Sequence, residues 1–319
     1  MPIVAITDYT FPSLDIETEI LEAAGFEVRS GQCKTPEALI ALVANADAVI
    51  TQFAPITPEV IDAMKQARVI VRYGVGVDNV NLEAARLRGI PVCNIPTFCI
   101  DEVADHTLGL ILAATRSLLP NANLVRDGKW GLAGPLTEMR TLRDQTVGIV
   151  GFGRIGAAVA ARLAPFKCKR LAFDPMTPAS VIESSGCQPA TVEKLLAEAD
   201  IVTLHCPSTP QTRNLLNSGS IAKMKPGAIV VNVARGDVIE TAALVAALQS
   251  GQIAAAALDV CNPEPIPLDS PLRSLPNVLV TSHIASASVA AVRTLRETAA
   301  QLAVTALRGE PLPTIVNGL

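Results

Sequence analysis

Residues 146–163 have the sequence "TVGIVGFGRIGAAVAARL", in which a β-branched run passes through three glycines into an alanine-rich segment. Gly151, Gly153 and Gly156 stand at the spacing G-x-G-x-x-G. Because β-branched residues favour strands and alanine favours helices, the stretch predicts a strand, a tight turn and a helix. In such a turn the first glycine permits the bend, the second leaves room for a pyrophosphate, and the third permits close packing of helix and strand.

The acid that follows the next predicted strand indicates which ligand such a turn holds. Asp174 lies 23 residues after Gly151 (174 − 151 = 23). A carboxylate at this place accepts hydrogen bonds from ribose hydroxyls and repels the additional phosphate of NADP. The sequence therefore predicts that the turn binds NAD. The alternatives are a glycine turn without a ligand and a solvated acid at a strand end.

Strand-like and helix-like segments alternate on both sides of this stretch. The expected strands cover residues 3–7, 26–30, 47–51, 68–73, 90–95, 146–150, 170–174, 200–207, 227–234, 254–260 and 277–283. Helical periodicity fills the intervals, forms a linking helix over 100–119 and returns at 288–309. This alternation predicts parallel sheets with crossover helices. Two such series in 319 residues predict two α/β domains, each with a doubly wound parallel sheet.

Composition excludes several classes of partner. The net charge is −4 and the longest basic cluster is "KCKR" at 167–170, so we expect no nucleic acid partner. No apolar run is long enough to cross a membrane, and the N-terminal "MPIVAITDYT" predicts a strand, not a signal peptide. The seven cysteines include no C-x-x-C pair, which argues against disulfides and metal ligation. We therefore expect a cytoplasmic protein without a metal.

Three polar residues follow predicted strands of the second series: Arg235, Glu264 and His283. Ligands of doubly wound sheets bind beyond the carboxyl ends of the strands, so we expect these side chains to gather on the nicotinamide side of one crevice. A guanidinium binds a carboxylate, an imidazole exchanges a proton near neutral pH, and a carboxylate beside the imidazole favours its protonated form. Together they predict hydride transfer to a 2-keto acid. Taken singly, each residue has an alternative interpretation. Arg235 can be a solvated charge in a turn, Glu264 a surface acid beside prolines, and His283 a cap at the end of a strand.

A second glycine-rich turn, "YGVGVDNV" at 73–80, is a candidate substrate site. Backbone N–H groups at Val75 and Gly76 can form a nest for a carboxylate, although such a turn can also serve folding alone. His106 falls in the linking helix and is expected to be structural. His205 is expected to pack near the adenosine part of the cofactor.

The stretches "RYGVGVDNVNLEAA", "GFGRIG", "NVARGDVIE" and "LDVCNPEPIPLDSPLRSLPNVLVTSHIA" resemble the D-isomer-specific 2-hydroxyacid dehydrogenase family. The resemblance extends over nearly the whole chain. It implies a flavodoxin-like substrate domain of residues 1–100 plus 287–319, an inserted Rossmann NAD-binding domain of residues 101–286, and a homodimer formed mainly through the latter.

The resemblance also implies site residues. It implies that His283 is the acid–base residue, that Glu264 orients His283, and that Arg235 binds the substrate carboxylate. It implies that Phe53, Val75 and Gly76 line the substrate site. The residues implied at the cofactor are Gly151, Gly153, Arg154, Ile155, Gly156, Asp174, Cys206, Pro207, Thr212, Val233, Ala234, Asp259 and Ser286.

Departures from the family pattern bear on the substrate. Ser282 and Ser286 stand where the family often has Pro and Gly, and Cys261 and Asn262 replace a frequent Phe-Glu pair, so we expect a pocket of different shape. The loop "TQFAP" at 51–55 offers Phe53 and no cation, whereas a phosphorylated substrate favours Arg or Lys. We therefore expect a small keto acid such as glyoxylate or hydroxypyruvate, and not 3-phosphoglycerate.

Other functions within the resemblance stay open. A formate dehydrogenase pairs its histidine with Gln, so Glu264 argues against that activity. A phosphite-type dehydrogenase shares the three residues and is not excluded by them. A corepressor-like binding protein gated by NAD would need a partner groove, which a sequence does not reveal.

Overall fold

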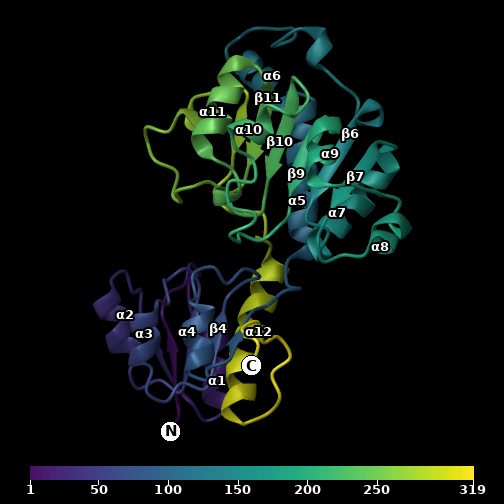
Figure 1. Cartoon of the computed structure of the whole chain (residues 1–319). Helices are drawn as coiled ribbons and strands as arrows, with labels where there is room; N and C mark the ends of the chain where they lie inside the picture. The colour runs from purple at the N-terminus through teal and green to yellow at the C-terminus, as the bar shows by residue number, and fades with distance from the viewer. The chain divides into compact units, whose positions relative to one another are not determined.

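The computed structural model describes residues 1–319 apart from the side chain of Glu138. The chain forms two compact units (Figure 1). Unit 1 consists of Met1–Cys99 with Ala287–Leu319, and unit 2 of Ile100–Ser286. Each unit contains one parallel sheet with helices packed on both faces. The predicted fold class, two doubly wound parallel sheets, is therefore confirmed.

The sheet of unit 1 has the strand order β2-β1-β3-β4-β5, which is the flavodoxin-like order. Its strands are β1 (Ile3–Ile6), β2 (Glu27–Ser30), β3 (Ala48–Thr51), β4 (Ile70–Arg72) and β5 (Val92–Cys93). All neighbouring strands pair in parallel. The chain reverses its winding between β1 and β3, so the loops after these strands flank a crevice.

Alternate residues of these strands face two different helical layers. Val4 and Ile6 pack towards one layer, while Ala5 between them packs towards the other. The first layer holds α1 (Asp15–Ala23) and α12 (Val289–Leu307), and the second holds α2 (Pro36–Val43), α3 (Pro58–Ala63) and α4 (Leu82–Leu87). Arg296 of α12 forms a two-pronged ion pair with the fully buried Glu17 of α1, which fastens the C-terminal helix to the N-terminal one.

The sheet of unit 2 has the order β12-β11-β10-β9-β6-β7-β8 and is parallel throughout. Its strands are β6 (Thr146–Val150), β7 (Lys169–Phe173), β8 (Gln188–Pro189), β9 (Ile201–Leu204), β10 (Ala228–Asn232), β11 (Ile253–Leu258) and β12 (Val278–Val280). This is the Rossmann order, with the switch point between β6 and β9. The predicted dinucleotide turn follows β6 directly.

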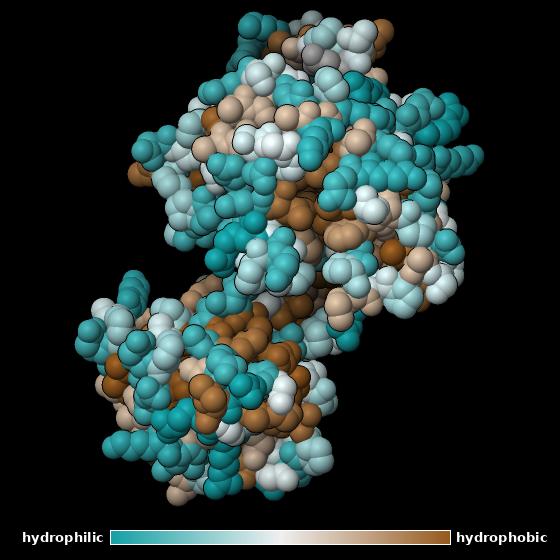
Figure 2. All heavy atoms as spheres, in the orientation of Figure 1, coloured by the Kyte–Doolittle hydropathy of each residue, from teal (hydrophilic) through white to brown (hydrophobic). Residues whose placement is uncertain are grey.

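Helices cover both faces of this second sheet. One face packs on α5 (Ile100–Thr115) and α7 (Arg154–Leu163). The other packs on α9 (Val192–Glu198), α10 (Ser218–Ile221) and α11 (Thr241–Ser250). The short helix α8 (Ala179–Ser184) leads into β8. On the face of unit 2 visible in Figure 2, hydrophilic side chains cover much of the surface and hydrophobic atoms lie in a hollow near its middle.

Two local features differ from the sequence prediction. The linking helix ends at Thr115 and not at residue 119, because Ser117 adopts a left-handed conformation with φ 47° before α6 (Leu118–Arg126) begins. β8 is a further strand, whose two residues are too few to produce a periodic pattern.

Neither a membrane-spanning helix nor a metal cluster is found among the residues that the structure describes. Among them, no single helix is long and apolar enough to cross a bilayer, although α5 and α6 meet that test together as a pair bent by 64°. The same residues contain no group of three or more His, Cys, Asp or Glu side chains able to hold a metal ion.

Candidate active site

Two of the three glycines in the turn after β6 stand where a side chain has no room. Gly151 has a φ of 91°, and a Cβ there would lie 2.6 Å from the backbone N of Cys206. A Cβ at Gly156 would overlap the carbonyl group of Gly151, so α7 begins in direct contact with the turn. Around Gly153, in contrast, a Cβ would meet nothing within 4 Å. Open space at the second glycine, next to the N-terminus of α7, is what a pyrophosphate group requires.

Asp174 follows β7 and stabilises the neighbouring turn. Its carboxylate accepts hydrogen bonds from the backbone N–H groups of Phe152 (2.7 Å), Met176 (2.8 Å) and Thr177 (3.1 Å). Three charge-assisted bonds fix the carboxylate at the end of β7: two of them end on Oδ1 and one on Oδ2, which leaves a lone pair on Oδ2 to accept a further bond. The residues present therefore fit a dinucleotide with free ribose hydroxyls.

The other predicted cofactor residues lie in loops of unit 2. Arg154 and Ile155 begin α7 beside the turn, and Cys206 and Pro207 follow β9. Thr212 donates a hydrogen bond to the carbonyl oxygen of Pro207 (2.5 Å), which closes that loop. Val233 and Ala234 follow β10 directly, and Ser286 ends unit 2. Almost all of them therefore lie beyond carboxyl ends of strands of one sheet.

His283 and Glu264 form a hydrogen-bonded pair. Nδ1 of His283 lies 2.9 Å from Oε2 of Glu264, and the second carboxylate oxygen accepts a bond from the N–H of Cys261 (2.9 Å). Partial burial alone would raise the pKa of Glu264, but the bonds from His283 and Cys261, with the charges of His283 and Arg235, lower it overall. Glu264 therefore remains a carboxylate beside the imidazole at neutral pH.

Arg235 stands at the turn after β10, close enough for its charge to act on Glu264. The turn is fixed by Asn232, whose fully buried amide donates to the carbonyl oxygen of Arg235 (2.8 Å) and accepts from the N–H of Ala234 (3.0 Å). The next residue, Gly236, packs so tightly on the backbone of Cys261 and Asn262 that a Cβ would overlap it. The turn of Arg235 and the loop of Glu264 are therefore in direct backbone contact.

Asp259 supports the segment that carries His283. It is 1% exposed, and its carboxylate accepts bonds from the hydroxyl of Thr281 (2.6 Å) and from the N–H groups of Ile284 and Ala285 (both 2.9 Å). Its carbonyl oxygen accepts the N–H of His283 (2.8 Å), a residue held at the left-handed φ of 57°. All three of these carboxylate bonds serve residues 281–285. Asp259 therefore positions the imidazole, whatever further contact it makes with a cofactor.

Unit 1 presents the predicted substrate residues on two adjoining loops. Phe53 is 53% exposed, and its backbone N–H donates to the carboxylate of Asp8 (2.6 Å). Val75 accepts a bond from the side-chain amide of Asn94 (2.6 Å), and Gly76 follows it in the glycine-rich turn. The guanidinium of Arg72 lies 5.9 Å from the centre of the Phe53 ring. The loop 51–55 contains no cation, but Arg72 of the adjacent strand therefore places one beside it.

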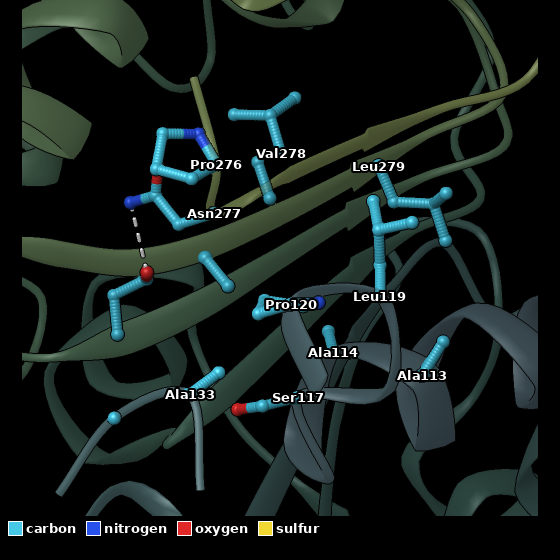
Figure 3. Close-up of a pocket in the computed structure, with 14 residues that line it drawn as sticks. Ala113, Ala114, Ser117, Leu119, Pro120, Ala133, Pro276, Asn277, Val278 and Leu279 are labelled. Atoms are coloured by element: carbon cyan, nitrogen blue, oxygen red, sulfur yellow. Dashed lines mark hydrogen bonds between the residues drawn. The ribbon is translucent and has the colours of Figure 1, made fainter. Parts of the chain in front are cut away.

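An apolar pocket at the edge of the unit 2 sheet lies away from these groups. It has a volume of about 210 Å³ and lies between the end of α5 and the beginnings of β11 and β12, where Asn277 donates to the carbonyl oxygen of Ala254 (3.0 Å; Figure 3). His283 follows the opposite end of β12. The pocket is therefore separate from the pair of His283 and Glu264.

The chain is similar in sequence and structure to several known proteins. Residues 108–285 match the model of the family described as D-isomer specific 2-hydroxyacid dehydrogenase, NAD binding domain. The chain belongs to this family. The glycine turn, Asp174 and the pair of His283 and Glu264 all lie within the matched NAD-binding domain of this 2-hydroxyacid dehydrogenase family member.

Individual relatives differ in length and in substrate. A D-3-phosphoglycerate dehydrogenase of Mycobacterium tuberculosis is 36% identical over 318 residues, which cover 99% of this chain and 59% of that protein. A glyoxylate reductase of Thermofilum pendens is 39% identical over 88% of this chain and 84% of that protein. The structure of a D-lactate dehydrogenase from Aquifex aeolicus, complexed with NAD and lactic acid, superposes with a TM-score of 0.87 at 26% identity, covering 96% of both chains. The chain thus spans about three fifths of the mycobacterial enzyme's length.

Three residues of the site were not predicted from the sequence. Asp8 acts through hydrogen bonds to the backbone of a neighbouring loop and Asn232 through bonds to the backbone of its own turn, and neither leaves a pattern in the sequence. Arg72 in "RYGVG" lies outside the loop 51–55, and it reaches Phe53 because it ends the adjacent strand β4.

Proposed function

We propose that this family member is an NAD-dependent oxidoreductase that transfers a hydride between nicotinamide and C2 of a small D-2-hydroxy acid or its 2-keto acid. The observation that carries the proposal is the 2.9 Å contact between His283 Nδ1 and Glu264 Oε2, on a sheet that also bears an open glycine turn. An imidazole held by a carboxylate at the carboxyl ends of the strands has the geometry of a general acid–base.

His283 is proposed to exchange the proton of the reaction. NADH, when bound, supplies the hydride that attacks C2 of the keto acid. The proton on Nδ1 of His283 is held by Glu264, so Nε2 is the nitrogen that delivers a proton to the developing alkoxide and removes it in the reverse direction. Because the pKa of Glu264 is lowered, Glu264 stays a carboxylate and keeps accepting the hydrogen bond from Nδ1 of His283.

Arg235 is proposed to bind the substrate carboxylate through a two-pronged contact and to polarise the adjacent carbonyl. In unit 1, Val75, Gly76 and Phe53 are proposed as substrate-binding residues, because two successive backbone N–H groups can bind an anion and Phe53 offers an apolar wall. Glyoxylate or hydroxypyruvate fits these groups. Arg72 beside Phe53 is a cation that the sequence argument against 3-phosphoglycerate did not include, so phosphorylated acids belong in the substrate test.

NAD is proposed to lie along the carboxyl edge of the unit 2 sheet, with its pyrophosphate over Gly153 and the N-terminus of α7. Asp174 would accept a hydrogen bond from the adenine ribose through Oδ2, and its charge disfavours NADP. Val233, Ala234 and Ser286 would lie around the nicotinamide, and Cys206, Pro207 and Thr212 would line the remaining cleft. Unit 1 is the proposed substrate domain, and a cytoplasmic location is proposed with it.

A homodimer formed through unit 2 is proposed as the assembly. The chain that follows α5 exposes a series of large apolar side chains, of which Trp130 is 91% exposed: Leu118, Val125, Trp130, Leu132 and Leu136. This segment also supplies Leu119, Pro120 and Ala133 to the pocket of Figure 3. Exposed apolar residues grouped beside an apolar pocket are typical of protein interfaces. Trp130→Glu with Leu132→Glu is expected to yield a monomer by sedimentation, and an unchanged mass would contradict the assignment.

The test is NADH oxidation with a panel of acids: glyoxylate, hydroxypyruvate, pyruvate, 2-ketogluconate and phosphohydroxypyruvate, with NADPH as the control cofactor. We expect turnover with an unphosphorylated keto acid and NADH. A higher kcat/KM with phosphohydroxypyruvate would transfer the assignment to phosphorylated acids. No turnover with any acid, in a protein that binds NADH, would contradict the proposal and favour phosphite oxidation or a cofactor-gated binding protein.

A further inference from the structure

A short chain of hydrogen bonds lies behind the segment that carries His283. His106 of α5 has its Nε2 3.3 Å from the hydroxyl oxygen of Thr281, and the hydroxyl of Thr281 donates to Oδ1 of Asp259 at 2.6 Å. Nε2 of His106 also lies 3.6 Å from the same carboxylate oxygen. The three residues come from a helix and from the ends of two strands, and all belong to unit 2.

The proton inventory fixes the direction of this chain. A threonine hydroxyl has one hydrogen, and Thr281 uses it towards Asp259. The oxygen of Thr281 can then only accept from His106, so the hydrogen of the His106 ring must be on Nε2. Each bond in the sequence His106, Thr281, Asp259 therefore points towards the carboxylate.

This carboxylate holds the backbone of the segment 281–285 in place. Besides Thr281, it accepts the N–H groups of Ile284 and Ala285, while the carbonyl oxygen of Asp259 accepts the N–H of His283. His283 has a φ of 57°, a left-handed conformation that is unfavourable for a residue with a side chain. The bonds from Asp259 offset that cost, and in this conformation Nδ1 of His283 reaches Glu264.

We propose that His106 and Thr281 are positioning residues for the acid–base reaction, which they support by fixing the Asp259 carboxylate that sets the backbone of His283. The inference rests on the proposed function of His283. It assigns His106 a role in the reaction that its place in a linking helix does not suggest. Without the Thr281 hydroxyl, Asp259 loses its shortest hydrogen bond and the segment relaxes away from φ 57°. The imidazole then meets Glu264 and substrate in a poorer geometry.

The test compares variants that remove or retain each hydrogen bond at nearly constant volume. Thr281→Val removes the hydroxyl and Thr281→Ser restores it, whereas His106→Leu removes the donor and His106→Gln keeps one. We expect kcat with the best keto acid to fall about tenfold or more in Thr281→Val and His106→Leu, since misplacement of a reacting group by about 1 Å can cost about 100-fold. The KM for NADH should stay within about twofold, and Thr281→Ser and His106→Gln should recover most of the loss. In the double variant Thr281→Val with His106→Leu, kcat should fall no further than in the more impaired of the two single variants.

Imidazole ¹⁵N NMR provides a readout that does not need turnover, because the chain contains only three histidines. We expect the Nε2–H tautomer at His106, and a shift of the His283 signals but not of the His205 signals in Thr281→Val. If the wild-type protein reduced no keto acid, the proposed function would be refuted, but the NMR test would still decide the positioning role. The positioning role is overturned if His106 carries its hydrogen on Nδ1, if Thr281→Val leaves the His283 signals unchanged, or if Thr281→Ser is as impaired as Thr281→Val. Should Thr281→Val fail to fold, the pair His106→Leu and His106→Gln decides by the same measurements.

Discussion

A methyl group at Gly236 tests the contact between the turn of Arg235 and the loop of Glu264. A Cβ at this position would overlap the carbonyl group of Cys261 and would lie 2.6 Å from the backbone N of Asn262. Atoms of this kind pack at roughly 3.5 Å, so the two backbones must separate by about 1 Å or more. Neither side can yield by a side-chain rotation, because the atoms in contact are backbone. Gly236→Ala therefore displaces Arg235, or the loop that orients Glu264, from its place.

The expected loss follows from the geometry of the reaction. Misplacement of a positioned group by about 1 Å costs about 100-fold, so kcat/KM for the keto acid should fall about 100-fold. The Kd for NADH should change by less than about threefold, because the glycine turn and Asp174 follow β6 and β7, which β9 separates from β10 and β11 in the sheet. The two quantities are measured by steady-state NADH oxidation and by titration of NADH fluorescence.

Gly109→Ala is the matched control. Gly109 lies within α5, and a Cβ there would meet nothing within 4 Å. This variant should keep wild-type kcat/KM and gain up to about 1 kcal/mol in free energy of unfolding. A folded Gly236→Ala protein with kcat/KM within fivefold of wild type would refute the reasoning. An equal loss of NADH affinity would refute it as well.

Three further predictions concern the cofactor, the pH dependence of stability and the substrate. Asp174→Ala should reduce the preference for NADH over NADPH, measured as the ratio of kcat/KM values; an unchanged ratio would remove Asp174 from the ribose site. Burial lowers the pKa of His205 from 6.5 to about 3, so the folded protein excludes a proton that the unfolded chain binds below pH 6.5. The free energy of unfolding should therefore fall as the pH decreases from 6.5, by up to about 1.4 kcal/mol per pH unit from this residue. His205→Gln should flatten the curve obtained by denaturant unfolding between pH 7 and pH 5, and parallel curves would show that His205 titrates normally. Arg72→Gln should raise the KM for phosphohydroxypyruvate more than the KM for glyoxylate, because only the phosphorylated acid has a second anionic group for this cation; equal effects would assign Arg72 to the structure of the loop.

The parts of the fold that the sequence predicted best are those with strong local signals. The expected strand 146–150 coincides with β6, since a β-branched run that ends at a glycine turn is recognisable within a few residues. Ser117 was missed because apolar spacing continues past it, and nothing local indicates a left-handed serine. β8 has only two residues and depends on pairing with β7, which is a tertiary interaction.

The same distinction applies to the site. Parallel strands share a carboxyl edge, so the ends of β10, β11 and β12 indicated that Arg235, Glu264 and His283 gather in one region. The supports of this site were not predictable in that way. Asp8 accepts a hydrogen bond from the N–H of Gln52, 44 residues away in the sequence, and Thr281 contacts His106, which is 175 residues away. These contacts depend on how whole elements pack, and a single sequence has no pattern that indicates them.

The central claim is that His283 exchanges the proton of a hydride transfer without holding the cofactor. The most direct measurement is the comparison of His283→Ala with wild type for turnover of the best keto acid and for the Kd of NADH. The account predicts a loss of kcat of at least about 1,000-fold, since general acid–base catalysis contributes about 100- to 10,000-fold, with the Kd of NADH within a few-fold of wild type. Turnover retained within tenfold would contradict the acid–base role, and a parallel loss of NADH affinity would show that His283 is structural.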